Sequence, residues 1–129
     1  MKTVEHERAV NSTPMSRELL HPTLDEIRLE NVMKALSDPV RMHMVRELSR
    51  TTGELSGASI DVPVSKATAT HHYRVLRESG VIQQNYRGTA KMSKLRRSDL
   101  DALFPGFLDA ALTAAVHEMA RHSGCVSQG

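Results

Sequence analysis

Hydrophobic residues recur at helical spacing in two consecutive stretches near the start of the chain. The first follows Thr23, a good N-cap residue, and Glu26 three positions later completes a capping box. Its apolar positions are Leu24, Ile27, Val32, Met33 and Leu36. In the second stretch, Asp38 precedes Pro39, whose missing N–H costs nothing in a first helical turn. Its stripe is Val40, Met44, Val45 and Leu48. The pattern predicts two helices, each with one buried face.

The periodicity weakens over 51–64, where ELSGAS favours a short helix and IDVPV a turn. Ser65 then caps a predicted helix over 66–79, which Gly80 ends in the left-handed conformation. The positions spaced to face the core are Ala69, His72, Tyr73 and Leu76. VIQQNY and AKMSKL flank RGT, which predicts a β-hairpin with Gly88 in its turn.

The last predicted helix starts at Ser98 or Asp99 and is interrupted near Pro105 and Gly106. Its apolar stripe comprises Leu100, Leu103, Phe104, Phe107, Leu108, Ala111, Leu112, Ala115, Val116 and Met119. This stripe is wide for a helix packed on one side only, so a second copy of the chain is expected to cover it. Burial within a single chain is the alternative interpretation.

The predicted organisation is a flexible N-terminal arm over 1–22, where NSTP and HP break the pattern, and a DNA-binding domain over 23–97. A dimerisation helix over 98–123 and a tail over 124–129 follow. The 129 residues include 3% aromatic residues and no Trp, which favours helices over a β-sandwich. The order of elements predicts a mainly α winged helix-turn-helix with a small β-hairpin wing.

Positive charge is concentrated between Ser65 and Arg97. This segment holds eight basic residues and one acidic residue, a net charge of +7, whereas the whole chain carries +2. A compact basic unit in a slightly acidic remainder is typical of a surface that binds double-stranded DNA. The predicted helix over 66–79 places Lys, Thr, His and Arg on its outward face, where they could reach phosphates and base edges in a major groove.

Two longer motifs carry a resemblance to a known family. ALSDPVRMHMVREL resembles the opening signature of the ArsR/SmtB family of bacterial repressors, and SKATATHHYRVLRESGVI is similar to its recognition-helix signature. RGTAK followed by LRRSDL is similar to the family's wing and its exit into the last helix. The resemblance spans roughly Leu29 to Leu108.

The resemblance implies a sequence-specific repressor that binds a palindromic operator and is released by an effector, here unknown. It implies a homodimer through the first and last helices. The DNA contacts it implies are Ser65, Lys66, Thr68, Thr70, His71, Arg74 and Arg77 of the recognition helix, with Arg87 and Lys91 of the wing.

The chain departs from the family's metal sensors. It has no cysteine between Arg50 and Ser59, so the thiolate cluster that binds arsenite is not expected there. The last helix offers Asp109, His117, Glu118 and His122, but not at the spacings of the family's other metal site. No metal and no cofactor are therefore expected, and a zinc site formed by these four residues across a dimer is the less favoured hypothesis. His71 and His72 point about 100° apart on a helix, so they cannot readily bind one ion together.

Several features of the sequence argue against other classes of protein. Cys125 alone cannot form an intrachain disulfide, which indicates a reduced, cytoplasmic protein, and an oxidation switch at this residue is the less favoured hypothesis. No apolar run is long enough to span a membrane, and the N-terminus has no apolar signal segment. No catalytic motif is recognisable, so an enzyme is not expected. A winged helix used only for protein interaction is the competing hypothesis, although it would not need the basic segment.

Overall fold

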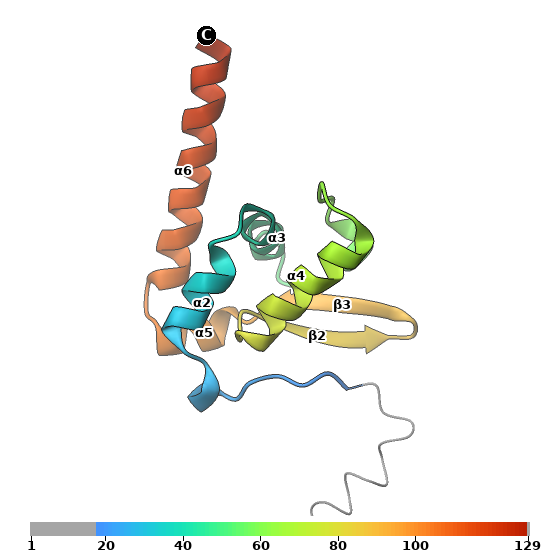
Figure 1. Ribbon diagram of the computed structural model, residues 1–129. Coiled ribbons are helices and arrows are strands. Elements are labelled where there is room, and N and C mark those ends of the chain that lie inside the picture. Colours follow the sequence, from blue (N-terminus) through green and yellow to red (C-terminus); the bar gives the residue numbers. More distant parts are fainter. Residues whose placement is uncertain (1–17, 129) are drawn as a thin grey trace, which may run out of the picture.

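The computed structural model describes residues 18–128, with side chains described as far as His122. The elements follow the order α2 (Leu29–Leu36), α3 (Pro39–Ser49), β1 (Leu55–Ser56), α4 (Lys66–Glu78), β2 (Ile82–Arg87), β3 (Ala90–Leu95), α5 (Arg97–Leu103) and α6 (Phe107–Gln128). The strands form one antiparallel sheet in the order β1-β3-β2. Figure 1 shows the β2–β3 hairpin projecting to one side of the helices, while α6 extends beyond the rest of the molecule.

Local capping chemistry sets the starts of α3 and α4 as the sequence predicts. The Asp38 carboxylate accepts hydrogen bonds from the backbone N–H groups of Val40 (2.9 Å) and Arg41 (3.1 Å). The Ser65 hydroxyl accepts one from the backbone N–H of Thr68 at 3.1 Å. Each cap satisfies N–H groups that have no partner inside the helix. Both predicted N-caps are confirmed.

Gly80 ends α4 and connects it closely to the start of the chain. Its φ is +91°, and the N–H groups of Gly80 and Val81 donate to the carbonyls of Arg77 and Leu76, the two bonds of a Schellman motif. A Cβ at this position would lie 2.6 Å from Ile27. Glycine is therefore required here both by the left-handed backbone and by the space that Ile27 occupies.

The hydrophobic core lies between the helices and the hairpin. Its fully buried aliphatic side chains come from five helices and the hairpin: Val32, Met44, Val45, Leu48, Leu76, Val81, Ile82, Leu100 and Leu108. Leu112 is also buried, whereas Val116 and Met119 farther along α6 are about half exposed. The first part of the α6 stripe is thus core of a single chain, and only its continuation is left uncovered.

The structure corrects the first predicted helix. Thr23 and Glu26 do pair, since the Thr23 N–H donates to the Glu26 carboxylate at 2.9 Å, but they close a single 3-10 turn, η2 (Leu24–Glu26). The backbone is extended at Ile27 and Arg28, and α2 begins only at Leu29. Ile27 lies at this break, buried in the core against Gly80.

Three other boundaries differ from the prediction. ELSGAS contains strand β1 and a 3-10 turn, η3 (Gly57–Ser59), because Leu55 and Ser56 pair with Ser93 and Met92 of β3. The last helical segment starts at Arg97, is interrupted at Gly106 (φ +81°) as predicted, and continues to Gln128, into the predicted tail.

No helix in the described range is long and apolar enough to cross a membrane.

The predicted arm is partly anchored. Residues 1–17 lie outside the described residues, but the following segment runs along the hairpin (Figure 1). His21 accepts a hydrogen bond from the backbone N–H of Gln84 (2.9 Å), and the Pro22 carbonyl accepts one from Arg96 (2.9 Å). Residues 21 and 22 therefore belong to the folded domain and not to a flexible arm.

Candidate nucleic-acid interface

The outward face of α4 carries most of the predicted DNA contacts. The exposed residues at its start and along it are Ser65, Lys66, Thr68, Thr70, His71 and Arg74. Ser65 also donates to the Thr68 hydroxyl at 3.0 Å, so these two side chains are engaged in the cap. Within the described part of the chain, Lys66 and Arg74 make no hydrogen bond or ion pair. These two cations are therefore available to a phosphate or a base edge.

The inward face of α4 is fixed by a polar contact as well as by packing. His72 is 8% exposed, as the spacing predicts, while the adjacent His71 faces solvent. The Arg41 guanidinium lies 3.1 Å from His72 Nδ1, and the Asp38 carboxylate lies 3.8 Å from its Nε2. Since Arg41 can only donate, Nδ1 is the acceptor and the ring proton sits on Nε2, facing Asp38. Arg41 also donates to the Ala35 carbonyl, which ties α2, α3 and α4 together.

Asp38 stays ionised in this arrangement. Partial burial by itself would raise the pKa of its carboxyl, but the backbone N–H of Arg41, the nearby His72 and the backbone N–H of Val40 lower it. The net result is a pKa below the ordinary value of 3.8. A negative charge at the N-terminus of α3 is also favoured by the helix dipole.

In the wing, the two predicted DNA contacts Arg87 and Lys91 each interact with another side chain of the same chain. Arg87 pairs with Glu54 through two 3.0 Å hydrogen bonds, Nε to Oε1 and Nη2 to Oε2. The Arg87 hydrogen bond is the main reason that the pKa of Glu54 falls below 4.5. Lys91 lies over the Tyr86 ring, 5.7 Å from its centroid. Gly88 is the first of the two residues that form the hairpin loop. Its φ is +65°, as a tight hairpin turn requires.

Arg77 points toward the hairpin. Its guanidinium donates to the Gln84 side-chain oxygen at 2.6 Å, and the Gln84 amide nitrogen donates to the Ser93 hydroxyl at 3.1 Å. Gln84 is 2% exposed and Ser93 is 1% exposed. Because the backbone N–H of Gln84 also donates to His21, this residue links α4, both strands of the wing and the N-terminal segment.

Sequence reasoning missed Glu54, Gln84 and His21. All three interact with residues that are distant along the chain: 33 residues separate Glu54 from Arg87, and 63 separate His21 from Gln84. A polar residue at a position that alternates toward the core, as Gln84 does in β2, is the one local signal available.

The possible metal ligands of the last helix do not converge. Asp109 pairs with Arg97 at 2.7 Å, while His117, Glu118 and His122 are exposed. Among the described residues, no three histidine, cysteine, aspartate or glutamate side chains are grouped so that they could hold an ion. The Cys125 side chain lies outside the described side chains, so the hypotheses about it stay open.

A capped helix with an outward row of basic residues, supported by α3 and flanked by a β-hairpin, defines a winged helix-turn-helix. The comparisons agree with this class. The chain is 33% identical over 87 residues to the uncharacterized HTH-type transcriptional regulator YceK of Bacillus subtilis (strain 168), a match covering 66% of this chain and 86% of that protein. No protein-family model matches the chain.

Solved structures of low sequence identity share the fold. An ArsR-like transcriptional regulator from Rhodococcus sp. RHA1 is 24% identical with a TM-score of 0.51, covering 78% of this chain and 90% of that one. Another ArsR family transcriptional regulator is 21% identical with a TM-score of 0.52, covering 72% and 96%. The chain thus belongs to the helix-turn-helix transcriptional regulators, and its fold is that of the ArsR family.

Proposed function

We propose that the protein is a dimeric, sequence-specific repressor that acts in the cytoplasm, binds a palindromic DNA operator and has no catalytic role. The observation that carries the proposal is the outward face of α4, where Lys66 and Arg74, unpaired among the described residues, lie beside Thr70 and His71. In a major groove, arginine can bond both acceptors of a guanine, while lysine and threonine reach phosphates or bases. The operator overlaps a promoter, and occupancy blocks transcription until an effector lowers the affinity.

The wing makes a smaller contribution to the affinity, from an adjacent phosphate. Arg87 and Lys91 lie on the hairpin that projects beside α4 (Figure 1). Phosphate contacts by basic residues release counterions, so binding should weaken steeply as salt is added. The proposed DNA contacts are those implied by the sequence, except for Arg77. The main role of Arg77 is to hold α4 against the wing through its hydrogen bond to Gln84.

A second copy of the chain covers the exposed apolar residues Leu29 and Met33 of α2 and Val116 of α6. Leu29, Met33 and Val116 are between 37% and 47% exposed, and the end of α6 stands away from the body of the molecule (Figure 1). Pairing of these helices would bury them and place two α4 helices on one side of the dimer. The half-sites of the operator should then lie about one helical turn, roughly 10 base pairs, apart.

The Met33→Asp variant tests this assembly. Sedimentation velocity should show dimers for the wild type and monomers for Met33→Asp, because the change places a charge in the proposed interface. Asn31→Asp, on the opposite face of α2, is the matched control and should stay dimeric. A Met33→Asp protein that is folded and fully dimeric would remove α2 from the interface.

Selection of binding sites from random duplex DNA tests the DNA-binding proposal itself. The expected product is a two-fold repeat with the half-site spacing given above. Transcription in vitro from a promoter carrying that site should fall as protein is added. Recovery of no consensus sequence would contradict specific binding and favour a protein-interaction module.

A further inference from the structure

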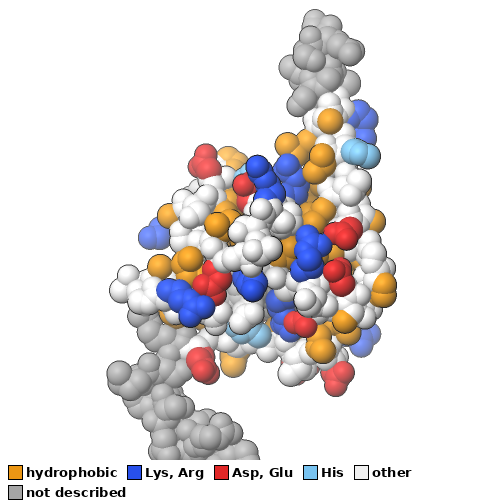
Figure 2. All heavy atoms as spheres, turned by 180° about the vertical axis from the view of Figure 1, so that it is seen from behind, with side chains coloured by type: hydrophobic (Ala, Val, Ile, Leu, Met, Phe, Trp, Pro, Cys, Tyr) orange, Lys and Arg blue, Asp and Glu red, His pale blue; other side chains and the backbone are white. Residues whose placement is uncertain are grey.

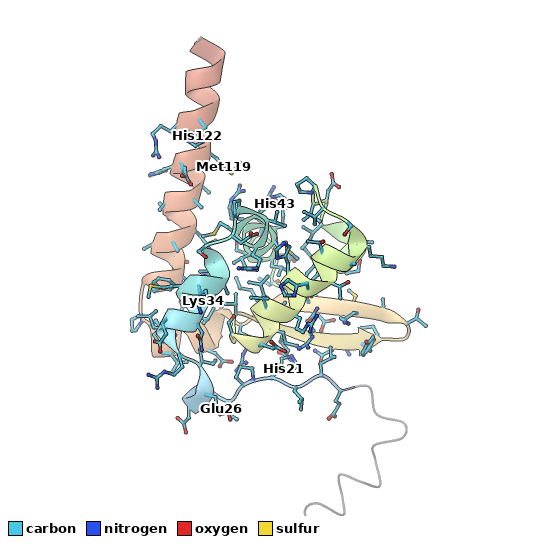
Figure 3. The ribbon with its side chains drawn as sticks, viewed as in Figure 1. His21, Glu26, Lys34, His43, Met119 and His122 are labelled. Atoms are coloured by element: carbon cyan, nitrogen blue, oxygen red, sulfur yellow. The ribbon has the colours of Figure 1, made fainter. Side chains whose placement is uncertain are left out.

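A groove of about 740 Å³ lies between α3 and α6, on a part of the molecule separate from the outward face of α4. Its lining includes the apolar side chains Leu36, Met42, Ala111, Ala115 and Met119. Figure 3 shows Met119 on α6 and His43 on α3, and Figure 2 shows hydrophobic and basic side chains side by side where α6 joins the body. The volume and the apolar lining are those of a site for a small organic molecule.

Arg46 gives this groove a preference for an anionic ligand. Its side chain lines the groove, it makes no ion pair with any described residue, and its Nε is buried without a hydrogen-bond acceptor. A buried donor without a partner is costly, and a guanidinium is best satisfied by a planar anion that accepts two hydrogen bonds. The other charges offset one another, because exposed Glu118 and Arg121 are of opposite sign and the Asp38 carboxylate is already engaged by the N-terminus of α3.

Two residues of the groove also touch the DNA-binding unit. Asp38 faces His72 of α4 at 3.8 Å. His43 Nε2 lies 3.1 Å from the carbonyl oxygen of Asp61, in the loop that leads into α4. A ligand that shifts the N-terminal half of α3 would therefore act on both the inner face of α4 and its entry loop.

We propose that this groove binds a small organic carboxylate with an apolar body, whose carboxylate accepts hydrogen bonds from Arg46. The apolar body packs against Met42 and Met119. The bound ligand lowers the affinity of α4 for DNA through Asp38 and His43. This last step rests on the proposed repressor function, whereas the binding step does not.

Calorimetric titration of the full-length protein with 1-naphthoate, without DNA, tests the site. Saturable binding is expected, with 1-naphthamide, the neutral analogue, at least about tenfold weaker. Arg46→Met should also lose about tenfold or more for 1-naphthoate. Arg50→Met is the matched control, since Arg50 directly follows α3, lies outside the groove and is paired with Glu47, and it should bind as the wild type does.

The fold of Arg46→Met is checked by its thermal midpoint, which should not fall, because the change removes an unsatisfied buried donor. If this variant does not fold, Arg46→Lys serves instead, with weaker binding expected from the loss of the planar fork. Absence of 1-naphthoate binding to the wild type, as when a second copy fills the groove, overturns the proposal. Equal affinity of Arg46→Met and Arg50→Met overturns it too.

The regulatory step has its own readout. On the selected operator, 1-naphthoate should weaken DNA binding by about fivefold or more in the wild type and much less in Arg46→Met. Binding of 1-naphthoate with unchanged DNA affinity would overturn the regulatory step. Absence of any DNA binding would instead refute the proposed function and leave the calorimetric result standing.

Discussion

The outward face of α4 and the wing both carry predicted DNA contacts, yet the basic side chains of the two regions are in different states. Lys66 and Arg74 on α4 are unpaired among the described residues, whereas Arg87 is held by Glu54 and Lys91 lies over Tyr86. A DNA phosphate can engage Lys66 or Arg74 directly. A phosphate that engages Arg87 meets a guanidinium whose charge is already offset by Glu54 and two of whose five N–H donors are already used. Charge counted along the sequence therefore overstates what the wing contributes to affinity.

Arg77 lies between these two regions and belongs to neither. It starts on α4 but bonds to Gln84 of β2, so its role is to fix the angle between helix and wing. Positioning of this kind matters for recognition because base contacts need accurate placement of the helix in the groove.

Arg74→Ala should give the largest effect. Loss of a direct contact from α4 is expected to weaken specific DNA binding by roughly 10-fold to 100-fold, or about 1–3 kcal/mol, without changing the dimer. Fluorescence anisotropy with the selected operator measures it. Arg50→Ala is the control and should change the affinity little, because Arg50 is an exposed arginine that directly follows α3 and is paired with Glu47. Dissociation of the Arg74→Ala dimer would show that α4 has been assigned the wrong exposed face.

Gln84→Leu should lower the free energy of unfolding by about 1–3 kcal/mol, because Arg77 and Ser93 would lose their partners in a buried site. The adjacent Gln83 is exposed, so Gln83→Leu should change stability by no more than about 0.5 kcal/mol. Urea denaturation of both variants provides the comparison. Equal stability of the two would mean that the Arg77–Gln84 contact does not join helix and wing.

Glu54→Gln should tighten DNA binding severalfold, since Arg87 is freed for a phosphate. The slope of log affinity against log salt should steepen by about 0.9, the value for one additional phosphate contact. Arg87→Ala should matter little in the wild type and more in the Glu54→Gln background. If Arg87→Ala weakens the wild type as strongly as Arg74→Ala does, Glu54 orients Arg87 and does not compete with DNA.

His21 should give the smallest effect, visible only below neutral pH. Burial is the largest cause and lowers the pKa of His21; a hydrogen bond with the backbone of Leu19, the second cause, raises it, and the charges of Arg77 and Arg96 lower it, so that the net shift is downward. The folded state therefore binds fewer protons than the unfolded state. The contribution to stability is complete above about pH 6.5 and declines as the pH falls from there toward the lower folded pKa.

The His21→Gln variant isolates this titration, because glutamine offers an acceptor but no titrating group. Thermal unfolding from pH 7.5 to 5 should show a steeper loss of stability in the wild type than in the variant. Parallel curves would mean that the bond from Gln84 to His21 does not couple the N-terminal segment to the wing.

Features set by neighbouring residues could be predicted from the sequence. The caps at Asp38 and Ser65, the left-handed glycines at 80, 88 and 106, and the inward position of His72 each follow from a few adjacent residues. The helix break at Ile27 could not be predicted from local residues, and the buried Ile27 packs against Gly80, over fifty residues away. Strand β1 was missed for the same reason, since two residues form a strand only if β3 is beside them.

The candidate site also contains features that the sequence predicts and features that it does not. Helical periodicity was enough to place Lys66, Thr70, His71 and Arg74 outward. The partners of Arg77 and Arg87 depend on how β2 and the β1 region pack against α4 and the wing tip, which no local pattern encodes. The width of the apolar stripe on α6 predicts a dimer interface along the whole helix. Leu108 and Leu112 of this stripe are in the core of the single chain, whereas Val116 and Met119 are exposed.

The most direct test of the account is a salt titration of DNA binding by the wild type and by Arg74→Ala, using the selected operator and a scrambled duplex. The account predicts that the wild type prefers the operator by several hundredfold, with a steep loss of affinity as salt rises. Arg74→Ala should lose most of that preference and keep its residual binding to scrambled DNA. Equal affinity of the wild type for both duplexes would contradict it and reduce α4 to a generic basic surface.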